Sequence, residues 1–208
     1  MSGRTETPKP RGPIMAVIYG TWRLTRGDPR GLSLFGGDVD AFGAAFAPWL
    51  AVFFVVGSVF ALSDGASVGF TAILLNFTCI LAQLVIAHAF ATHWARERLW
   101  MRYAVAAMWT MWLPFLLQVF VTPLLHFTLP SSIIDTRGGA IGTNLVFFVY
   151  ELWLTWFVAR VALALSRGRA VLLVSAIYGA GIVMDVTAAL LPPYYNFWTD
   201  FSTPLFGN

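Results

Sequence analysis

The sequence has 208 residues, of which 58% are hydrophobic and 11% are charged, and its mean hydropathy is +0.73. A soluble domain has about 25% charged residues, so this composition indicates one integral membrane domain and excludes a separate soluble enzyme domain. The net charge of +3 does not favour nucleic acid as a partner, and a single cysteine excludes an intramolecular disulfide.

The N-terminal part divides into two segments. Residues 1–13 are polar and rich in proline, which is typical of a disordered leader. Residues 14–27 have the pattern of an amphipathic helix, with apolar residues at helical spacing on one side: Ile14, Val17, Ile18 and Trp22. We expect this helix to lie at the membrane surface, with Trp22 inward and Arg23 and Arg26 toward anionic lipid. The alternative is a short soluble cap that packs on the loops.

Residues 28–191 are expected to form one transmembrane domain. A helix needs about 20 mostly apolar residues to cross the hydrocarbon core, and five stretches meet this requirement, at about 42–62, 68–91, 103–127, 141–165 and 170–191. Short connections make the first two spans, and the last two, antiparallel neighbours. Pro114 and Pro123 should kink or break the third span. The sequence therefore predicts an all-α integral membrane protein, a compact five-helix bundle with an N-terminal interfacial amphipathic helix.

The basic residues predict the orientation of the bundle. Of the 13 Lys and Arg residues, 12 lie on the side of the leader, and Arg137 alone lies on the other. Cytoplasmic loops hold an excess of Lys and Arg, so we expect a bacterial inner-membrane protein with a cytoplasmic N-terminus and a periplasmic C-terminus. Residues 192–208 form an aromatic tail that suits the outer interface.

Four polar residues inside the spans form the candidate site. At 1.5 Å per residue, Glu151 and Asp185 lie about 22 and 24 Å from the cytoplasmic ends of their spans, and Asn76 and Gln118 lie at about 24 and 22 Å. A charged side chain at the bilayer centre costs about 2.5–3.5 kcal/mol on insertion scales, so both carboxyls should face the bundle interior, where they could share a proton. Two interpretations stay open: a proton-linked or polar-ligand site, and hydrogen bonds that only hold the helices together.

The histidines do not indicate catalysis. His88, His93 and His126 lack the spacing of metal ligands, and no nucleophile accompanies them at one depth. We therefore expect no enzyme activity, no metal site and no cofactor.

Three segments resemble a known family: YGTWRLTRGDPRGLSLF in the leader, RYAVAAMWTMWLPFLLQ in the third span, and YELWLTWFVARVALALSRGRAVLLVSAIYGAGIVMDV in the last two. Over most of residues 17–190 the chain is similar to bacterial five-span membrane proteins of unknown function that are grouped with the Yip domain family. This resemblance implies a protein that acts by interaction or by organising the bilayer. Its partners would be the lipid bilayer and a protein partner or a second copy. The rival hypothesis is a small channel or proton-coupled transporter built on the four polar residues.

Overall fold

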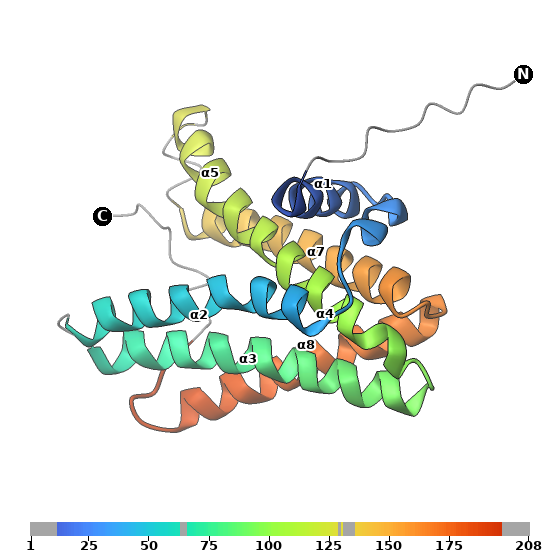
Figure 1. Ribbon diagram of the computed structural model, residues 1–208. Helices are drawn as coiled ribbons and strands as arrows, with labels where there is room; N and C mark the ends of the chain where they lie inside the picture. The colour runs from blue at the N-terminus through green and yellow to red at the C-terminus, as the bar shows by residue number, and fades with distance from the viewer. Residues whose placement is uncertain (1–11, 63–65, 129, 131–135, 197–208) are drawn as a thin grey trace, which may run out of the picture.

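A computed structural model of the chain describes residues 12–62, 66–128, 130 and 136–196 (Figure 1). Within these ranges the regular structure is helical and no strand occurs. Five helical stretches are long and apolar enough to cross a membrane. The predicted all-α, five-span architecture is therefore confirmed at this level. Residues 1–11 of the predicted leader and 197–208 of the predicted tail lie outside the described residues.

Four of the spans are single helices, whose bounds are α2 (Val39–Ala61), α3 (Ala66–His93), α7 (Arg137–Ala162) and α8 (Arg167–Leu190). Three of them begin at a residue whose side-chain oxygen accepts a hydrogen bond from a backbone N–H of the first turn: Asp38 for α2, Thr136 for α7 and Ser166 for α8. Such caps satisfy amides that have no partner inside the helix. The helix starts are therefore encoded locally.

The third span consists of two helices, α4 (Glu97–Thr110) and α5 (Trp112–Thr128), which meet at Met111. Pro114 explains the break, because proline has no N–H to donate to the Thr110 carbonyl and its ring crowds that carbonyl. The Thr110 side-chain hydroxyl donates to the Ala106 carbonyl, one turn earlier, at 2.8 Å. Pro123 lies inside α5 without ending it. Of the two prolines expected to disturb this span, the first one interrupts it.

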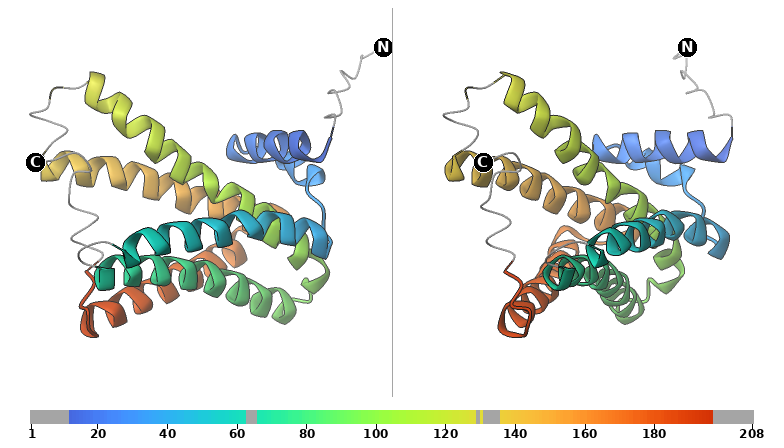
Figure 2. Two further views of the ribbon diagram at one scale, coloured as in Figure 1. Left: turned by 60° about the vertical axis from the view of Figure 1, so that its left-hand side comes forward. Right: turned by 90° about the vertical axis from the view of Figure 1, so that its left-hand side faces the viewer.

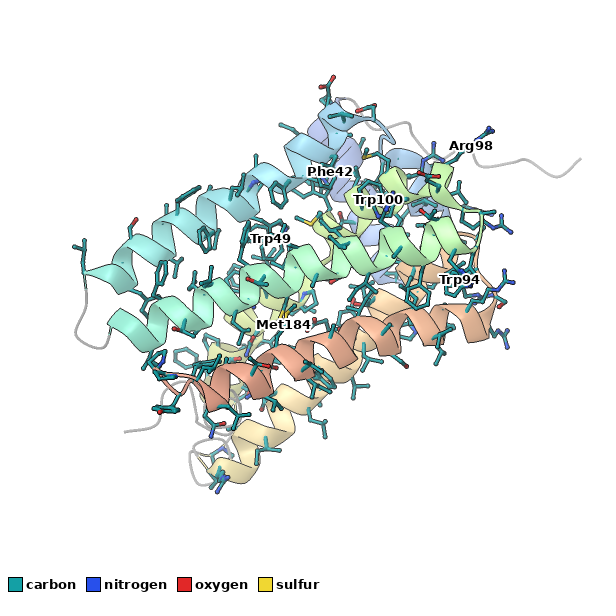
Figure 3. The ribbon with its side chains drawn as sticks, turned by 90° about the horizontal axis from the view of Figure 1, so that it is seen from below. Phe42, Trp49, Trp94, Arg98, Trp100 and Met184 are labelled. Atoms are coloured by element: carbon teal, nitrogen blue, oxygen red, sulfur yellow. The ribbon has the colours of Figure 1, made fainter. Side chains whose placement is uncertain are left out.

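Helix α4 forms the centre of the bundle. All residues from Tyr103 to Met108 are buried, and α4 contacts α2, α3, α5 and α7. Two indole N–H groups donate to backbone carbonyls near α4: Trp49 to Met108, and Trp100 to Leu84, each at 3.2 Å. Figure 3 shows Trp49 and Trp100 among the helices. Helix α4 is therefore enclosed by the protein rather than by lipid.

Helices α2, α3, α5 and α7 lie around α4, and α8 packs against α3 and α7. Helix α3 packs against α2 on one side and α8 on the other, and α7 contacts both α4 and α8. Helix α5 contacts α7 and α4, and its C-terminal part diverges from the rest of the bundle (Figure 2). The polar side chains that matter below come from α3, α4, α7 and α8, which meet in the middle of this arrangement.

The N-terminal segment forms a unit of helix α1 (Pro13–Thr25) and 3-10 helix η1 (Pro29–Leu34). In Figure 1 the axis of α1 points toward the viewer while α2 and α3 run across the picture. In the right-hand view of Figure 2, α1 runs across the picture and α2 and α3 point toward the viewer. Helix α1 therefore lies across the direction of the spans. It sits over the half of the bundle that contains the α3–α4 and α7–α8 connections, and it contacts α4 and α7.

Candidate functional site

Two features of the structure are candidates for function: the N-terminal unit and a polar cluster inside the bundle. The N-terminal unit is held together by close backbone packing. A Cβ on Gly31 would lie 2.6 Å from the Gly20 carbonyl oxygen, so α1 and η1 approach more closely than any side chain at residue 31 would allow. Leu24 and Phe35 are buried at this junction, with exposed fractions of 0% and 3%. The unit is thus part of the protein core.

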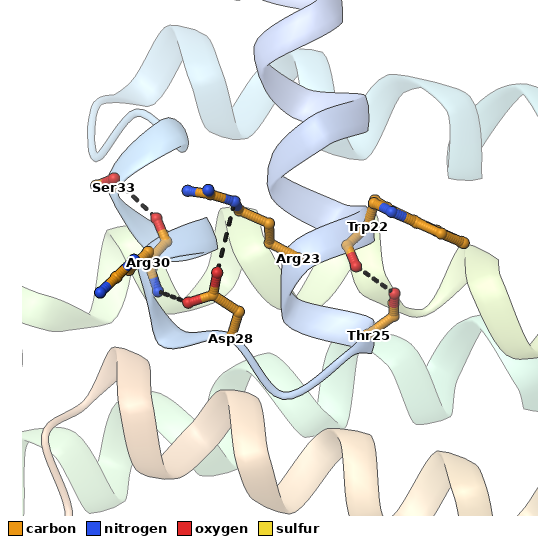
Figure 4. A network of polar contacts seen from close by, with 6 residues as sticks. All are labelled: Trp22, Arg23, Thr25, Asp28, Arg30 and Ser33. Carbon is orange, nitrogen blue, oxygen red and sulfur yellow. Dashed lines mark hydrogen bonds and ion pairs between the residues drawn. The ribbon is translucent and has the colours of Figure 1, made fainter. Parts of the chain in front are cut away.

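Polar contacts close the turn between α1 and η1 (Figure 4). The Asp28 carboxylate accepts a hydrogen bond from the Arg30 N–H at 2.9 Å and lies 3.5 Å from Nε of Arg23. The Arg23 guanidinium also stacks over the Tyr19 ring, 4.8 Å from its centroid. Arg23, a predicted lipid contact, is therefore engaged mainly within the unit.

Helix α7 fixes the C-terminal end of α1. The Tyr150 hydroxyl donates to the Thr25 carbonyl at 3.1 Å, and the Trp153 ring lies against Gly27, whose φ of +76° favours glycine. The Trp153 ring also stacks on those of Tyr150 and Phe157. Because α7 also contributes to the polar cluster, the N-terminal unit and the cluster share one helix.

The outer side of α1 has an apolar stripe of four exposed residues: Ile14 (74% exposed), Met15 (58%), Ile18 (58%) and Trp22 (51%). At 100° per residue these four fall within an arc of about 100°. Val17, expected on the same side, instead packs against the core. The Arg26 guanidinium lies 4.5 Å from the Trp22 ring centroid, at the edge of the stripe. Helix α1 thus has one side toward the bundle and one exposed apolar side, and Arg26 follows its last residue.

The polar cluster inside the bundle is centred on Glu151. The Tyr178 hydroxyl, on α8, donates to Oε1 of Glu151, on α7, at 3.2 Å. The Thr155 hydroxyl lies 3.5 Å from the same Tyr178 oxygen. We call Glu151, Thr155 and Tyr178 the Glu151 cluster. It joins α7 to α8 by hydrogen bonds between side chains.

Asp185 lies away from this cluster. It is seven residues beyond Tyr178 on α8, which corresponds to about 10 Å along the helix axis. The turn between α7 and α8 lies three residues earlier than predicted, since α7 ends at Ala162 rather than at 165 and α8 begins at Arg167 rather than at 170. Because the helices are antiparallel, this shift moves Glu151 toward the turn and Asp185 away from it. Among the described residues, no hydrogen bond joins the two carboxyls.

The two amides occupy other places. The Gln118 amide donates to the Asn144 side-chain oxygen at 3.2 Å, which joins α5 to α7. Asn144 is seven residues before Glu151, again about 10 Å along the axis. Asn76 is exposed on α3. The four residues expected in one layer are thus distributed over several positions, and only Glu151 belongs to the cluster.

A small cavity adjoins the Glu151 cluster. It is lined by residues of α3, α4 and α7 and by the residue between α4 and α5: Gln83, Tyr103, Ala107, Thr110, Met111, Thr155 and Val158. Thr155 therefore belongs both to the cavity wall and to the cluster. Sequence reasoning did not place Thr155 and Tyr178 in the site, although Thr155 shares a helix face with Glu151 and Tyr178 shares one with Asp185. Tyr103, inside the apolar run YAVAA, had no comparable signal.

Comparison with known proteins identifies no relative: no family model, no curated protein and no solved structure matches the chain. In the described part of the chain, no three His, Cys, Asp or Glu side chains are grouped as metal ligands would be. The one close His–carboxylate pair there joins His88 and Glu97, with Nε2 and Oε1 3.9 Å apart.

Proposed function

We propose that this chain is a Yip-like multi-pass protein of the bacterial inner membrane that acts by interaction or membrane organisation rather than catalysis, with its N-terminus in the cytoplasm. In this proposal α1 is the membrane-contacting element. The observation that supports it is the exposed apolar stripe on a helix whose opposite side is docked on the bundle. Its lipid partner would be the cytoplasmic leaflet, because 12 of the 13 basic residues are expected on that side.

The orientation of α1 favours this function over a soluble cap. A helix that lies across the spans can place an apolar side among acyl chains and a basic side among headgroups. Exposed apolar surface in water is unfavourable by about 25 cal/mol per Å², so contact with the bilayer would stabilise the position of α1. In this proposal Arg26, beside Trp22, is the cation that meets the headgroups.

Docking couples this surface contact to the spans. Tyr150 and Trp153 of α7 hold the end of α1, so α1 would act as a fixed wedge beside the bundle rather than as a tethered peptide. A fixed wedge in one leaflet displaces headgroups on that side alone. That asymmetry is a means of organising or curving the bilayer.

The test is to measure the depth of α1 and its effect on vesicle shape. In a Cys79→Ser background, Met15→Cys is labelled with an environment-sensitive fluorophore, and quenching by lipids with spin labels at defined depths is recorded in liposomes with anionic lipid. We expect quenching near the glycerol level. A fluorophore that is quenched only by aqueous reagents would contradict membrane contact.

Vesicle shape is compared between the wild type and a double variant that carries both Ile14→Ser and Ile18→Ser. The control is Val39→Ser, which changes an apolar residue that is 71% exposed at the start of α2. We expect the α1 variant alone to lose any remodelling of liposomes seen by electron microscopy. Deletion of residues 1–30 is less informative, because it also removes Leu24, which is fully buried.

The Glu151 cluster supports a second candidate function, proton-coupled transport or conduction. A carboxyl that lies within a transmembrane bundle and accepts a tyrosine hydrogen bond is a typical element of a proton relay. The test is proton or ion flux into liposomes, with Glu151→Gln compared with Asp185→Asn at matched folding stability. Flux that is lost in Glu151→Gln alone would establish the cluster as its route. Absence of flux in the wild type would leave the cluster as a structural contact.

A further inference from the structure

Four exposed arginines lie at one end of the bundle, and we call them the arginine cluster. Arg96 directly precedes α4 and Arg98 lies in its first turn, while Arg167 and Arg169 lie in the first turn of α8. The Arg169 guanidinium carbon is 5.8 Å from the ring centroid of Trp94, which is two residues before Arg96. The α3–α4 and α7–α8 connections are therefore neighbours. Figure 3 shows Trp94 and Arg98 at this same end of the helices.

The positive charge of the arginine cluster has no carboxylate partner in the described part of the chain. The ion pairs there join Arg23 to Asp28 and His88 to Glu97. Glu97, which follows Arg96 in the sequence, is thus engaged by a side chain outside the cluster. The N-terminal ends of α4 and α8 add partial positive charge of their own, and a cation in the first turn is unfavourable beside it. An anion bound at this end would offset both contributions.

An apolar surface continues from the cluster along the spans. Leu172 and Val183 lie within about 60° of Arg169 around α8, and they are 55% and 65% exposed. On α3 the Phe90 ring packs on that of Trp94, with the ring centroids 4.9 Å apart. A tryptophan at the end of a span is typical of the membrane–water interface. This arrangement fits a ligand with a charged head and apolar chains better than it fits an acidic soluble protein.

We propose that the arginine cluster binds the headgroup phosphate of an anionic phospholipid whose acyl chains lie along α3 and α8. Arginine suits this role because its guanidinium donates two parallel hydrogen bonds to phosphate oxygens. Such a lipid ties the α3–α4 connection to the α7–α8 connection from outside the helices. The site is separate from the apolar stripe of α1, so it does not require α1 to enter the bilayer.

The first measurement compares two lipids on the purified wild-type protein in a mild detergent. Native mass spectrometry, which resolves each bound lipid by its mass, gives the dissociation constants of phosphatidylglycerol and of phosphatidylcholine with the same acyl chains. We expect phosphatidylglycerol to bind at least about tenfold more tightly, because two or more arginines meet its net negative charge. Inorganic phosphate should not displace it beyond the effect of chloride at equal ionic strength. Equal dissociation constants, or displacement by inorganic phosphate, would overturn the proposal.

The second measurement locates the site with single variants. Arg169→Gln and Arg96→Gln should each weaken phosphatidylglycerol binding by about fivefold. The control is Arg137→Gln, which removes the same charge from an exposed arginine in the first turn of α7, at the other end of the bundle. It should leave binding unchanged, and so should the double variant Ile14→Ser with Ile18→Ser. An equal loss in Arg137→Gln would mean that net charge alone acts, and a loss in the α1 variant would assign the lipid to α1. Either result overturns the proposal, and the wild-type comparison holds even where a variant does not fold.

Discussion

Replacement of Tyr178 by Phe tests what the Glu151 cluster contributes to stability. The change removes one oxygen and keeps the ring, which packs edge-on against Phe148 at a centroid distance of 5.6 Å. It also removes the hydrogen bond to Glu151 at 3.2 Å and the contact with Thr155 at 3.5 Å. The Glu151 carboxyl then loses its donor within the described residues. The expected result is a less stable bundle with unchanged helix content.

The size of the loss can be bracketed. Hydrogen bonds between transmembrane helices contribute about 0.6 kcal/mol on average and at most about 1.7 kcal/mol. A buried acceptor that is left unpaired costs about 1–3 kcal/mol, and Glu151 is only partly buried. We therefore expect Tyr178→Phe to lower the free energy of unfolding by about 1–2 kcal/mol, toward the lower part of the combined range.

The assay is reversible unfolding in mixed micelles of a mild detergent and SDS, followed by circular dichroism. Glu151→Gln keeps an acceptor oxygen and should cost less than Tyr178→Phe. The double variant Tyr178→Phe with Glu151→Leu replaces both partners by apolar groups and should recover much of the loss, since neither is then left unpaired. Tyr178→Phe at wild-type stability, or a double variant less stable than Tyr178→Phe alone, would refute the reasoning.

Three further predictions concern the N-terminal unit and the first span. Gly31→Ala should lower the free energy of unfolding by about 1–3 kcal/mol, because its Cβ meets backbone that cannot move aside. Thermal unfolding measures this loss, and a variant as stable as the wild type would contradict the close packing. Tyr150→Phe should speed tryptic cleavage after Arg26 by loosening the end of α1, and an unchanged rate would mean that other contacts hold it. Asp38→Ala should cost about 1 kcal/mol and raise amide exchange in the first turn of α2, whereas Ser33→Ala, on an exposed turn, should leave that turn unchanged.

The positions of the spans could be predicted from local features. Each spanning stretch is long and apolar, and inside a bilayer the backbone must satisfy its own hydrogen bonds, which leaves a helix as the outcome. The break after Thr110 follows from Pro114 in the same way, although it was expected only as a kink or break somewhere in the span. The helix over Pro13–Thr25 was also predicted from its spacing, within two residues at its end.

The contents of the polar cluster could not be predicted in this way. A depth counted from a helix end inherits the error of that end, and three residues correspond to about 4.5 Å and most of a turn. In the antiparallel pair α7 and α8, the same shift of the turn moved Glu151 and Asp185 in opposite directions along the membrane normal. Glu151 consequently meets Tyr178 rather than Asp185.

The sequence by itself determined which segments are helical and apolar, because hydropathy, capping residues and prolines act within a few residues of their own position. The tertiary structure alone decided that Val17 packs against the core, that Gly31 lies against a backbone carbonyl, and that Thr155 and Gln83 line one cavity. These outcomes depend on the register and rotation of helices that are distant in the chain. A change of one residue turns a helix face by 100°, and no local pattern specifies that angle.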